Sequence, residues 1–234
     1  PQPEKKPTAM PTTLYADIKE AAQYLYHWKG MMVLIFSAAA LNFLLAPASA
    51  LVPLLVTRRF GGKALELAWM NSAYGIGLIS GGLLMGAWGG FKHRVKTIVL
   101  GAAGMGAGIC LLAAAPGAAL WMGLLGMGLS GFMNPVCNSP LTALMQSSVE
   151  PSMQGRVFTL VGSVGNLATP LAMIISGPVA DAIGIDIWYW IGGLGTLALT
   201  AALASNRPLM RLEQEAQERQ ILLNDTSTPE TANL

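Results

Sequence analysis

The chain has 234 residues, of which 53% are hydrophobic and 11% are charged, and its net charge is +2. About a quarter of the residues of a soluble domain are charged, so this composition predicts an integral membrane protein. The basic residues are dispersed between apolar runs instead of forming a patch with aromatic residues, which argues against a nucleic-acid partner.

The first 29 residues divide into two parts. Residues 1–13 contain four prolines and three charged residues, and this composition predicts a disordered linker. In residues 14–29 the apolar side chains recur at helical spacing, with charged residues on the other faces. This pattern predicts an amphipathic helix at the membrane interface, and the alternative of a soluble surface helix is disfavoured because a long apolar run follows directly.

Five uncharged stretches follow, and each is long enough to cross a bilayer, which takes about 20 residues. The third stretch, residues 97–149, has 53 residues and must hold two helices, with a turn at Pro116-Gly117. The sequence therefore predicts a transmembrane domain over residues 30–206 and a cytoplasmic tail over residues 207–234. The six spans are expected at about residues 30–57, 67–91, 97–115, 118–149, 157–180 and 187–206.

Lys and Arg are distributed unevenly between the two sides of this topology. The side that holds both termini carries eleven of them, or nine without the remote Lys5 and Lys6, and the other side carries three. By the positive-inside rule both termini are in the cytoplasm. The adjacent Arg58 and Arg59 on the outer side run against this trend.

Glycines recur four residues apart in several spans, which lets helix backbones approach closely in lipid. We interpret these pairs as sites of helix packing and not as a specific dimerisation motif. The pairs are Gly77 and Gly81, Gly82 and Gly86, Gly86 and Gly90, and Gly104 and Gly108.

Acids, bases and metal ligands are missing from the expected spans. His27 and His93 lie at helix ends, and Cys110 and Cys137 lie in apolar runs without metal-ligand spacing. We therefore expect no catalytic residues, metal or cofactor, and the protein is not expected to be an enzyme. Rings of acids, which would suggest a cation channel, are also missing.

Polar residues recur every fourth position in the fourth span, from Ser130 to Gln146, and Pro135 and Pro140 interrupt the same helix. Such a helix is expected to face protein or water and not lipid. Asn134, Asn138 and Thr142 share one face because four-residue steps drift by only about 40°. Each amide has the alternative role of an interhelical hydrogen bond. The candidate residues of a substrate pathway are Asn42, Asn71, Asn134, Asn138, Thr142, Gln146 and Asn166.

Three segments, residues 82–101, 131–166 and 176–185, resemble the C-terminal six-helix half of a major facilitator superfamily transporter. The run from Met153 to Phe158, after Pro151, resembles the macrolide-efflux branch. This resemblance implies an all-α membrane fold of twelve helices in two halves, with substrate bound at the midplane between them and alternating access. It also implies that residues 1–13 link this half to a missing N-terminal six-helix half, in a bacterial plasma membrane.

The sequence departs from one pattern of this family. The loop between the second and third helices of a half often carries Gly-x-x-x-Asp-Arg-x-Gly-Arg, and here Gly90 stands at the position of the acid. We therefore do not expect a charge-relay latch. Only the basic part of this loop remains, as Lys92, Arg94 and Lys96. Gly177-x-x-x-Asp181-x-x-Gly184 echoes the pattern on the outer side.

Prolines and a Gly-Arg pair are the candidates for kinks and gating, namely Pro135, Pro140, Pro170, Gly155 and Arg156. Arg156 is expected at the cytoplasmic mouth of the fifth span, where a guanidinium can hold a carboxylate such as Glu150 or cap a neighbouring helix. The alternative is a charge that serves only topology.

Together these observations predict half of a secondary transporter that uses an ion gradient to export hydrophobic or amphiphilic small molecules such as macrolide-like drugs. Any carboxylates for proton coupling would come from the missing half. Two alternatives stay open: a non-transporting six-helix membrane anchor or assembly protein, and a half-size transporter that dimerises.

Overall fold

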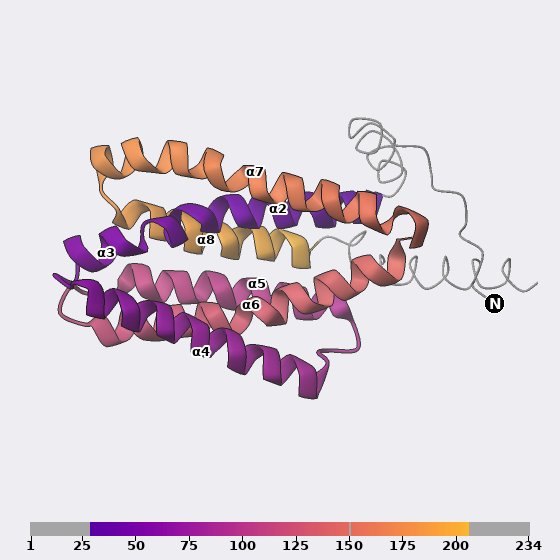
Figure 1. Cartoon of the computed structure of the whole chain (residues 1–234), viewed down its shortest axis with the longest axis horizontal. Coiled ribbons are helices and arrows are strands. Elements are labelled where there is room, and N and C mark those ends of the chain that lie inside the picture. The colour runs from indigo at the N-terminus through magenta and orange to yellow at the C-terminus, as the bar shows by residue number, and fades with distance from the viewer. Residues whose placement is uncertain (1–28, 150, 206–234) are drawn as a thin grey trace, which may run out of the picture.

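The computed structural model describes residues 29–149 and 151–205. The expected linker (1–13), nearly all of the expected interfacial helix (14–29) and the expected tail (207–234) lie outside this described part. The described residues form six long helices and one short helix, joined by turns (Figure 1). They are α2 (Lys29–Ala50), α3 (Val52–Arg58), α4 (Ala64–Trp88), α5 (Arg94–Ala114), α6 (Leu120–Ser148), α7 (Pro151–Ile183) and α8 (Asp186–Ala204).

Capping hydrogen bonds and glycines mark the ends of several helices. The backbone N–H of Lys63 donates to the carboxylate of Glu66 over 2.6 Å at the start of α4, and this hydrogen bond lowers the pKa of Glu66. Helix α4 ends before Gly89, whose φ of 73° is left-handed and whose N–H bonds to the carbonyl of Met85. Gly184, with a φ of 94°, ends α7 in the same region of backbone space. Glycine adopts this conformation without steric cost.

Each long helix overlaps one expected span, but two boundaries differ. The expected first span is divided into α2 and α3, because Pro53 has no N–H to donate to the carbonyl of Ser49. Helix α7 begins at Pro151, six residues before the expected residue 157. Proline is favoured in the first turn of a helix, where its missing N–H costs nothing.

Packing follows the order α4, α6, α5, α8, α2 and α7, each helix lying against the next (Figure 1). The order of packing is symmetric. If α2 is relabelled as α6, α4 as α7 and α5 as α8, and the reverse, the same set of main helix-to-helix contacts results. The contact of α4 with α6 becomes that of α7 with α2, and the contact of α5 with α6 becomes that of α8 with α2. The chain therefore holds two three-helix units, residues 29–114 and 120–204, that pack in equivalent ways.

Glycines set the separation of several helix pairs. A methyl group on Gly77 would lie 2.8 Å from the backbone nitrogen of Phe132, and one on Gly108 would lie 2.7 Å from the carbonyl oxygen of Gly126. The packing role predicted for the pair Gly77 and Gly81 and for the pair Gly104 and Gly108 is therefore confirmed. It is wrong within the described residues for the pair at 82 and 86, where no other atom lies within 4 Å of such a methyl group.

Four helical stretches of the described part are long and apolar enough to cross a membrane: Met32–Arg58, Arg94–Ala114, Leu120–Ser147 and Asp186–Ala204. Helices α4 and α7 are not among these four stretches. They nevertheless expose large aliphatic side chains, such as Leu83 and Ile174, each with 71% of its surface accessible. Such surfaces suit lipid or another helical domain. The six spans and their boundaries stay predictions.

Candidate functional site

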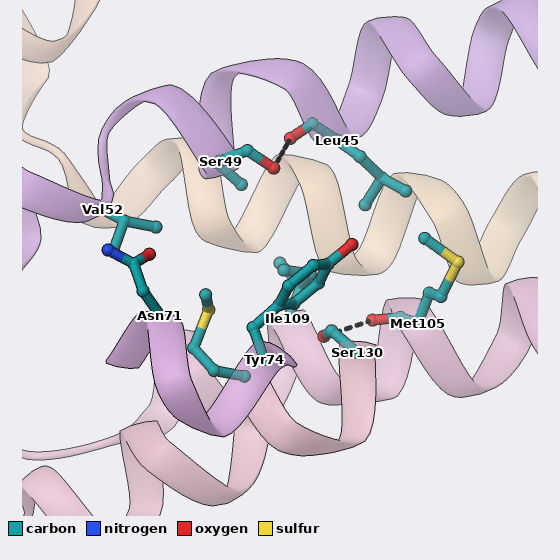
Figure 2. Close-up of a pocket in the computed structure, with 10 residues that line it drawn as sticks. Leu45, Ser49, Val52, Asn71, Tyr74, Met105, Ile109 and Ser130 are labelled. Carbon is teal, nitrogen blue, oxygen red and sulfur yellow. Dashed lines mark hydrogen bonds between the residues drawn. The ribbon is translucent and has the colours of Figure 1, made fainter. Parts of the chain in front are cut away.

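A cavity of about 300 Å³ lies between α2, α3, α4, α5 and α6 (Figure 2). Its walls are mainly apolar, with methionines from α5 and α6 and aliphatic residues from α2, α3 and α5. An amide, a phenol and two serine hydroxyls interrupt this apolar surface. The lining consists of Leu45, Ala48, Ser49, Val52, Asn71, Tyr74, Met105, Ile109, Met127 and Ser130.

A second cavity of about 70 Å³ lies between α2, α5 and α6. Leu45 and Met105 line both cavities, so the two adjoin each other along α2 and α5. The smaller cavity is the one richer in amides. Its lining consists of Ala38, Leu41, Asn42, Leu45, Met105, Asn134, Cys137, Asn138 and Leu141.

The structure brings some of the candidate pathway residues together. Asn42 of α2 meets Asn134 and Asn138 of α6 around the smaller cavity, and Asn71 of α4 lines the larger one. The next polar residues along α6 lie outside both linings, since neither Thr142 nor Gln146 contributes to them. Asn166 belongs to α7, and the position of its side chain lies outside the described part.

The amides around the smaller cavity bond within their own helices. The Asn138 amide donates to the backbone oxygen of Asn134 over 3.1 Å and to its side-chain oxygen over 3.2 Å. The Asn42 amide donates to the carbonyl of Ala38, and the Thr142 hydroxyl donates to the carbonyl of Asn138, each over 2.9 Å. Among the described residues none of these side chains hydrogen-bonds to another helix.

Sequence reasoning missed Tyr74 and did not single out Ser130 as a site residue. Tyr74 lies three residues after Asn71, so both project from one face of α4. That spacing was a usable signal once Asn71 had been chosen. The hydroxyl of Ser130 donates to the carbonyl of Met105 over 3.4 Å, which links α6 to α5 at the cavity wall.

Comparison with known proteins identifies the family of the chain. Residues 31–228 match the sequence model of the Major Facilitator Superfamily. The chain belongs to the major facilitator superfamily. The expected all-α membrane fold of this superfamily is thereby confirmed, and the protein is a multi-pass membrane protein.

Similar members of the superfamily carry efflux names. The chain is 28% identical over 187 residues to Macrolide efflux protein A of Streptococcus pyogenes, covering 80% of this chain and 46% of that protein. It is 27% identical to Macrolide efflux protein A of Enterococcus faecalis over 157 residues, 67% of this chain and 49% of the other. It is 26% identical to Multidrug efflux pump Tap of Mycolicibacterium fortuitum over 185 residues, 79% of this chain and 44% of that pump. The chain spans about half the length of the curated relatives it matches, and the resemblance to the macrolide-efflux branch is confirmed.

The two prolines of α6 lie inside a helix that continues through both of them. Pro135 and Pro140 have no N–H to donate to the carbonyls of Gly131 and Val136. Such interruptions are tolerated in transporter helices that line a cavity. Pro170 is in the same way internal to α7. A bending or gating role of these prolines in this superfamily member stays a prediction.

Gly155 and Arg156 lie within α7, because the helix begins at Pro151 and not at residue 157 as expected. The guanidinium of Arg156 lies 3.9 Å from the sulfur of Met153, one turn earlier. The proposed carboxylate partner, Glu150, lies outside the described residues. The gating role of this pair therefore stays a prediction.

The expected basic loop is only partly a loop, because α5 begins at Arg94 and of the three basic residues only Lys92 precedes the helix. The guanidinium of Arg94 donates to the carbonyl of Ala143 over 3.0 Å and to the hydroxyl of Ser147 over 2.9 Å, near the C-terminus of α6. A cation is stabilising at that end of a helix. Lys92 and Lys96, like Arg94, are exposed. Glycine at position 90 has a φ of 85°, so an acid at this position of the family pattern would be strained.

At the opposite end of the bundle two arginines at the end of α3 pair with acids. Arg59 lies 2.9 Å from Asp186 at the start of α8 and donates to the carbonyl of Ala113 over 2.8 Å. Arg58 lies 3.7 Å from Asp181 of α7. These contacts give a structural reason for the arginine pair that runs against the charge trend used for orientation. They also give the acid of the Gly177-x-x-x-Asp181 segment a partner.

Proposed function

We propose that the full-length protein is a secondary transporter that exports hydrophobic or amphiphilic compounds such as macrolide-like drugs. The observation that carries this proposal is the pair of adjoining, mainly apolar cavities between α2 and α6. They occur in a superfamily member whose similar proteins are named for macrolide and multidrug efflux. A ligand pocket is typically apolar with a few polar groups that orient the ligand.

The chemistry of the linings supports an uncharged or weakly polar contact with substrate. No charged side chain lines either cavity, and a buried charge without a partner is costly in a membrane. Asn42 and Asn138 each use their amide N–H₂ within their own helices, and their side-chain oxygens bond to no other described residue. These oxygens are free to accept hydrogen bonds from a substrate hydroxyl or amine.

Energy coupling needs a group that these cavities do not supply. Proton-coupled transporters use intramembrane carboxylates, and neither lining contains one. We propose that an N-terminal six-helix half supplies the coupling groups and completes the substrate path opposite α2 and α6. We place the complete transporter in a bacterial plasma membrane with both termini in the cytoplasm, on the basis of the distribution of Lys and Arg.

The test is accumulation of a panel of dyes and macrolides in cells that express the complete protein, with and without an uncoupler of the proton gradient. Export predicts lower accumulation in expressing cells, restored to the control level by the uncoupler if protons drive transport. Equal accumulation of every compound, at verified membrane abundance, would contradict export and favour a non-transporting anchor. Export by this chain expressed alone would instead favour a half-size transporter that dimerises.

A further inference from the structure

Two polar side chains of the larger cavity have no hydrogen-bond partner among the described residues. The amide of Asn71 and the hydroxyl of Tyr74 make no hydrogen bond with any residue that the structure describes. The other two polar side chains of this cavity do bond internally: Ser49 donates to the carbonyl of Leu45 over 3.2 Å, and Ser130 donates to that of Met105. Asn71 and Tyr74 therefore offer hydrogen-bonding capacity to whatever occupies the cavity.

The positions of these two residues suit a ligand that lies across the cavity. Figure 2 shows Tyr74 reaching from α4 toward the helix that carries Leu45, with its ring beside Ile109. Asn71 lies one turn earlier on α4 and points toward Val52 at one end of the cavity (Figure 2). A molecule placed between α2 and α4 would thus meet an amide at one end and a phenol hydroxyl farther along.

The rest of the lining defines the chemistry of the occupant. Acidic and basic side chains do not contribute to this lining, and its remaining surface is aliphatic or thioether. Met105 and Met127 are flexible and polarisable, so they can adapt to ring systems of different shapes. A permanent cation would find no counter-charge here, whereas a hydroxyl or carbonyl group would find both a donor and an acceptor. The fitting ligand part is neutral, apolar and oxygen-bearing.

We propose that the larger cavity is a subsite for the neutral, hydroxyl- and carbonyl-bearing part of a substrate, with Asn71 and Tyr74 as the residues that determine this specificity. The proposal rests on the proposed export function and adds that the two cavities contact different parts of a substrate. The larger cavity recognises neutral oxygen groups, and the smaller cavity, with Asn42 and Asn138, adjoins it through Leu45 and Met105. The volume of the larger cavity, about 300 Å³, is at the lower end of the range for ligand pockets.

The experiment compares two probes on the purified full-length protein. One probe is the macrolactone erythronolide, which is neutral and carries hydroxyl and carbonyl groups, and the other is ethidium, a permanent cation. The first variant is Tyr74→Phe, which removes only the hydroxyl. The matched control is Tyr189→Phe on α8, because the Tyr189 hydroxyl is also without a partner among the described residues but is buried in the core and does not itself line the cavity.

Tyr74→Phe removes one hydrogen bond, so this variant is expected to bind erythronolide roughly 2- to 10-fold more weakly. Its affinity for ethidium should be unchanged. Tyr189→Phe should alter neither affinity. Asn71→Leu, which keeps the side-chain size but removes both hydrogen-bonding groups, should also weaken erythronolide selectively. Affinity is measured on folded, purified protein, so a change in expression does not affect the comparison.

An unchanged erythronolide affinity in both cavity variants, or an equal loss for both probes, would overturn the subsite. So would wild-type protein that exports ethidium but does not bind erythronolide, while leaving the export function intact. Wild-type protein that exports neither probe nor any compound of the accumulation panel would instead contradict the proposed function itself.

Discussion

At the scale of single residues, asparagine side chains differ in which hydrogen-bonding groups their surroundings leave without a partner. The N–H₂ group of Asn138 donates to Asn134, one turn earlier in α6, whereas Asn71 makes no hydrogen bond with a described residue. A polar group that is already bonded contributes to binding only through its remaining lone pairs. If both cavities bind substrate as proposed, we expect them to discriminate between substrates by different atoms, although both contain asparagine.

Replacing Asn138 by Leu in the full-length transporter tests the smaller cavity. Leu retains the size of the side chain but removes its oxygen, so export of substrates that donate hydrogen bonds should fall by about 3- to 10-fold, as expected for one hydrogen bond. Export of several compounds is measured beside membrane abundance. An unchanged substrate profile, or a uniform loss that follows reduced abundance, would remove Asn138 from the substrate path.

Arg94 is expected to contribute to stability through α6. Arg94→Ala removes the hydrogen bonds to Ala143 and Ser147, and because Arg94 is exposed the free energy of unfolding should fall by only about 1 kcal/mol. Lys96→Ala is the matched control, since it removes the same charge from an exposed side chain two residues away. Thermal unfolding in detergent gives both values. Equal effects of the two variants would show that only charge matters here.

Arg156→Lys distinguishes a fork-shaped contact from a simple topology charge. Lysine keeps the positive charge but not the planar, multiply donating guanidinium. If Arg156 is a conformational residue of α7, this variant should lose transport at normal abundance. Normal transport by Arg156→Lys would leave Arg156 with a role in topology alone.

At the scale of helices, glycine position decides which faces touch. Gly77 and Gly81 lie against the backbone of α6, whereas Gly82 and Gly86, on another face of the same helix, meet no atom within 4 Å. Repetition at intervals of four therefore identifies close-packing residues only when the face that meets another helix is known. This distinction is invisible in the sequence, because both pairs share the same spacing.

Alanine substitutions should separate these two faces. Gly81→Ala forces a methyl group into the backbone of Phe132, and such overpacking is expected to cost about 1 to 3 kcal/mol of the free energy of unfolding. Gly86→Ala should be neutral or stabilising by up to about 1 kcal/mol, because alanine favours the helix. Thermal unfolding of the two variants in one detergent measures the difference. A similar loss in both would mean that Gly86 contacts protein outside the described residues.

Helix positions were predictable because uncharged runs and proline-glycine turns are local signals. The expected fifth span begins at residue 157, after the charged Arg156, whereas helix α7 extends back beyond the apolar run to Pro151. The placement of Asn42 and Asn138 around one cavity was not predictable, since it depends on how α2 lies across that cavity from α6. The contribution of Tyr74 was missed for the same reason, because an isolated aromatic residue in a span is indistinguishable from one that faces lipid.

At the scale of the whole molecule, the orientation of the bundle remains a prediction from its charges. Both termini are expected in the cytoplasm, so the α3–α4 and α5–α6 turns should face outward. Labelling of intact cells with an impermeant thiol reagent should therefore reach Gly61→Cys or Gly117→Cys but not Thr228→Cys, in a background without the native cysteines. Labelling of Thr228→Cys alone would invert the topology.

The two ion pairs at the same end of the bundle should differ in strength. Arg59 and Asp186 are 20% and 63% exposed and 2.9 Å apart, whereas Arg58 and Asp181 are 55% and 72% exposed and 3.7 Å apart. Asp186→Asn should lower the free energy of unfolding by about 1 kcal/mol, and Asp181→Asn by nearly nothing. Thermal unfolding at low and high salt checks both values. Equal losses, or a loss confined to Asp181→Asn, would contradict this ranking.

The contacts of Arg59 also bear on how the protein is made. Its guanidinium touches the carbonyl of Ala113 at the end of α5 and the carboxylate of Asp186, which lies 127 residues later in the chain. During synthesis, α3 and α5 leave the ribosome long before the first residue of α8 exists. A nascent chain that stops short of α8 therefore displays an arginine without its acid at the membrane surface. When α8 joins the bundle, Asp186 pairs with that arginine. The ion pair is therefore present in the completed bundle and absent from a chain that lacks α8.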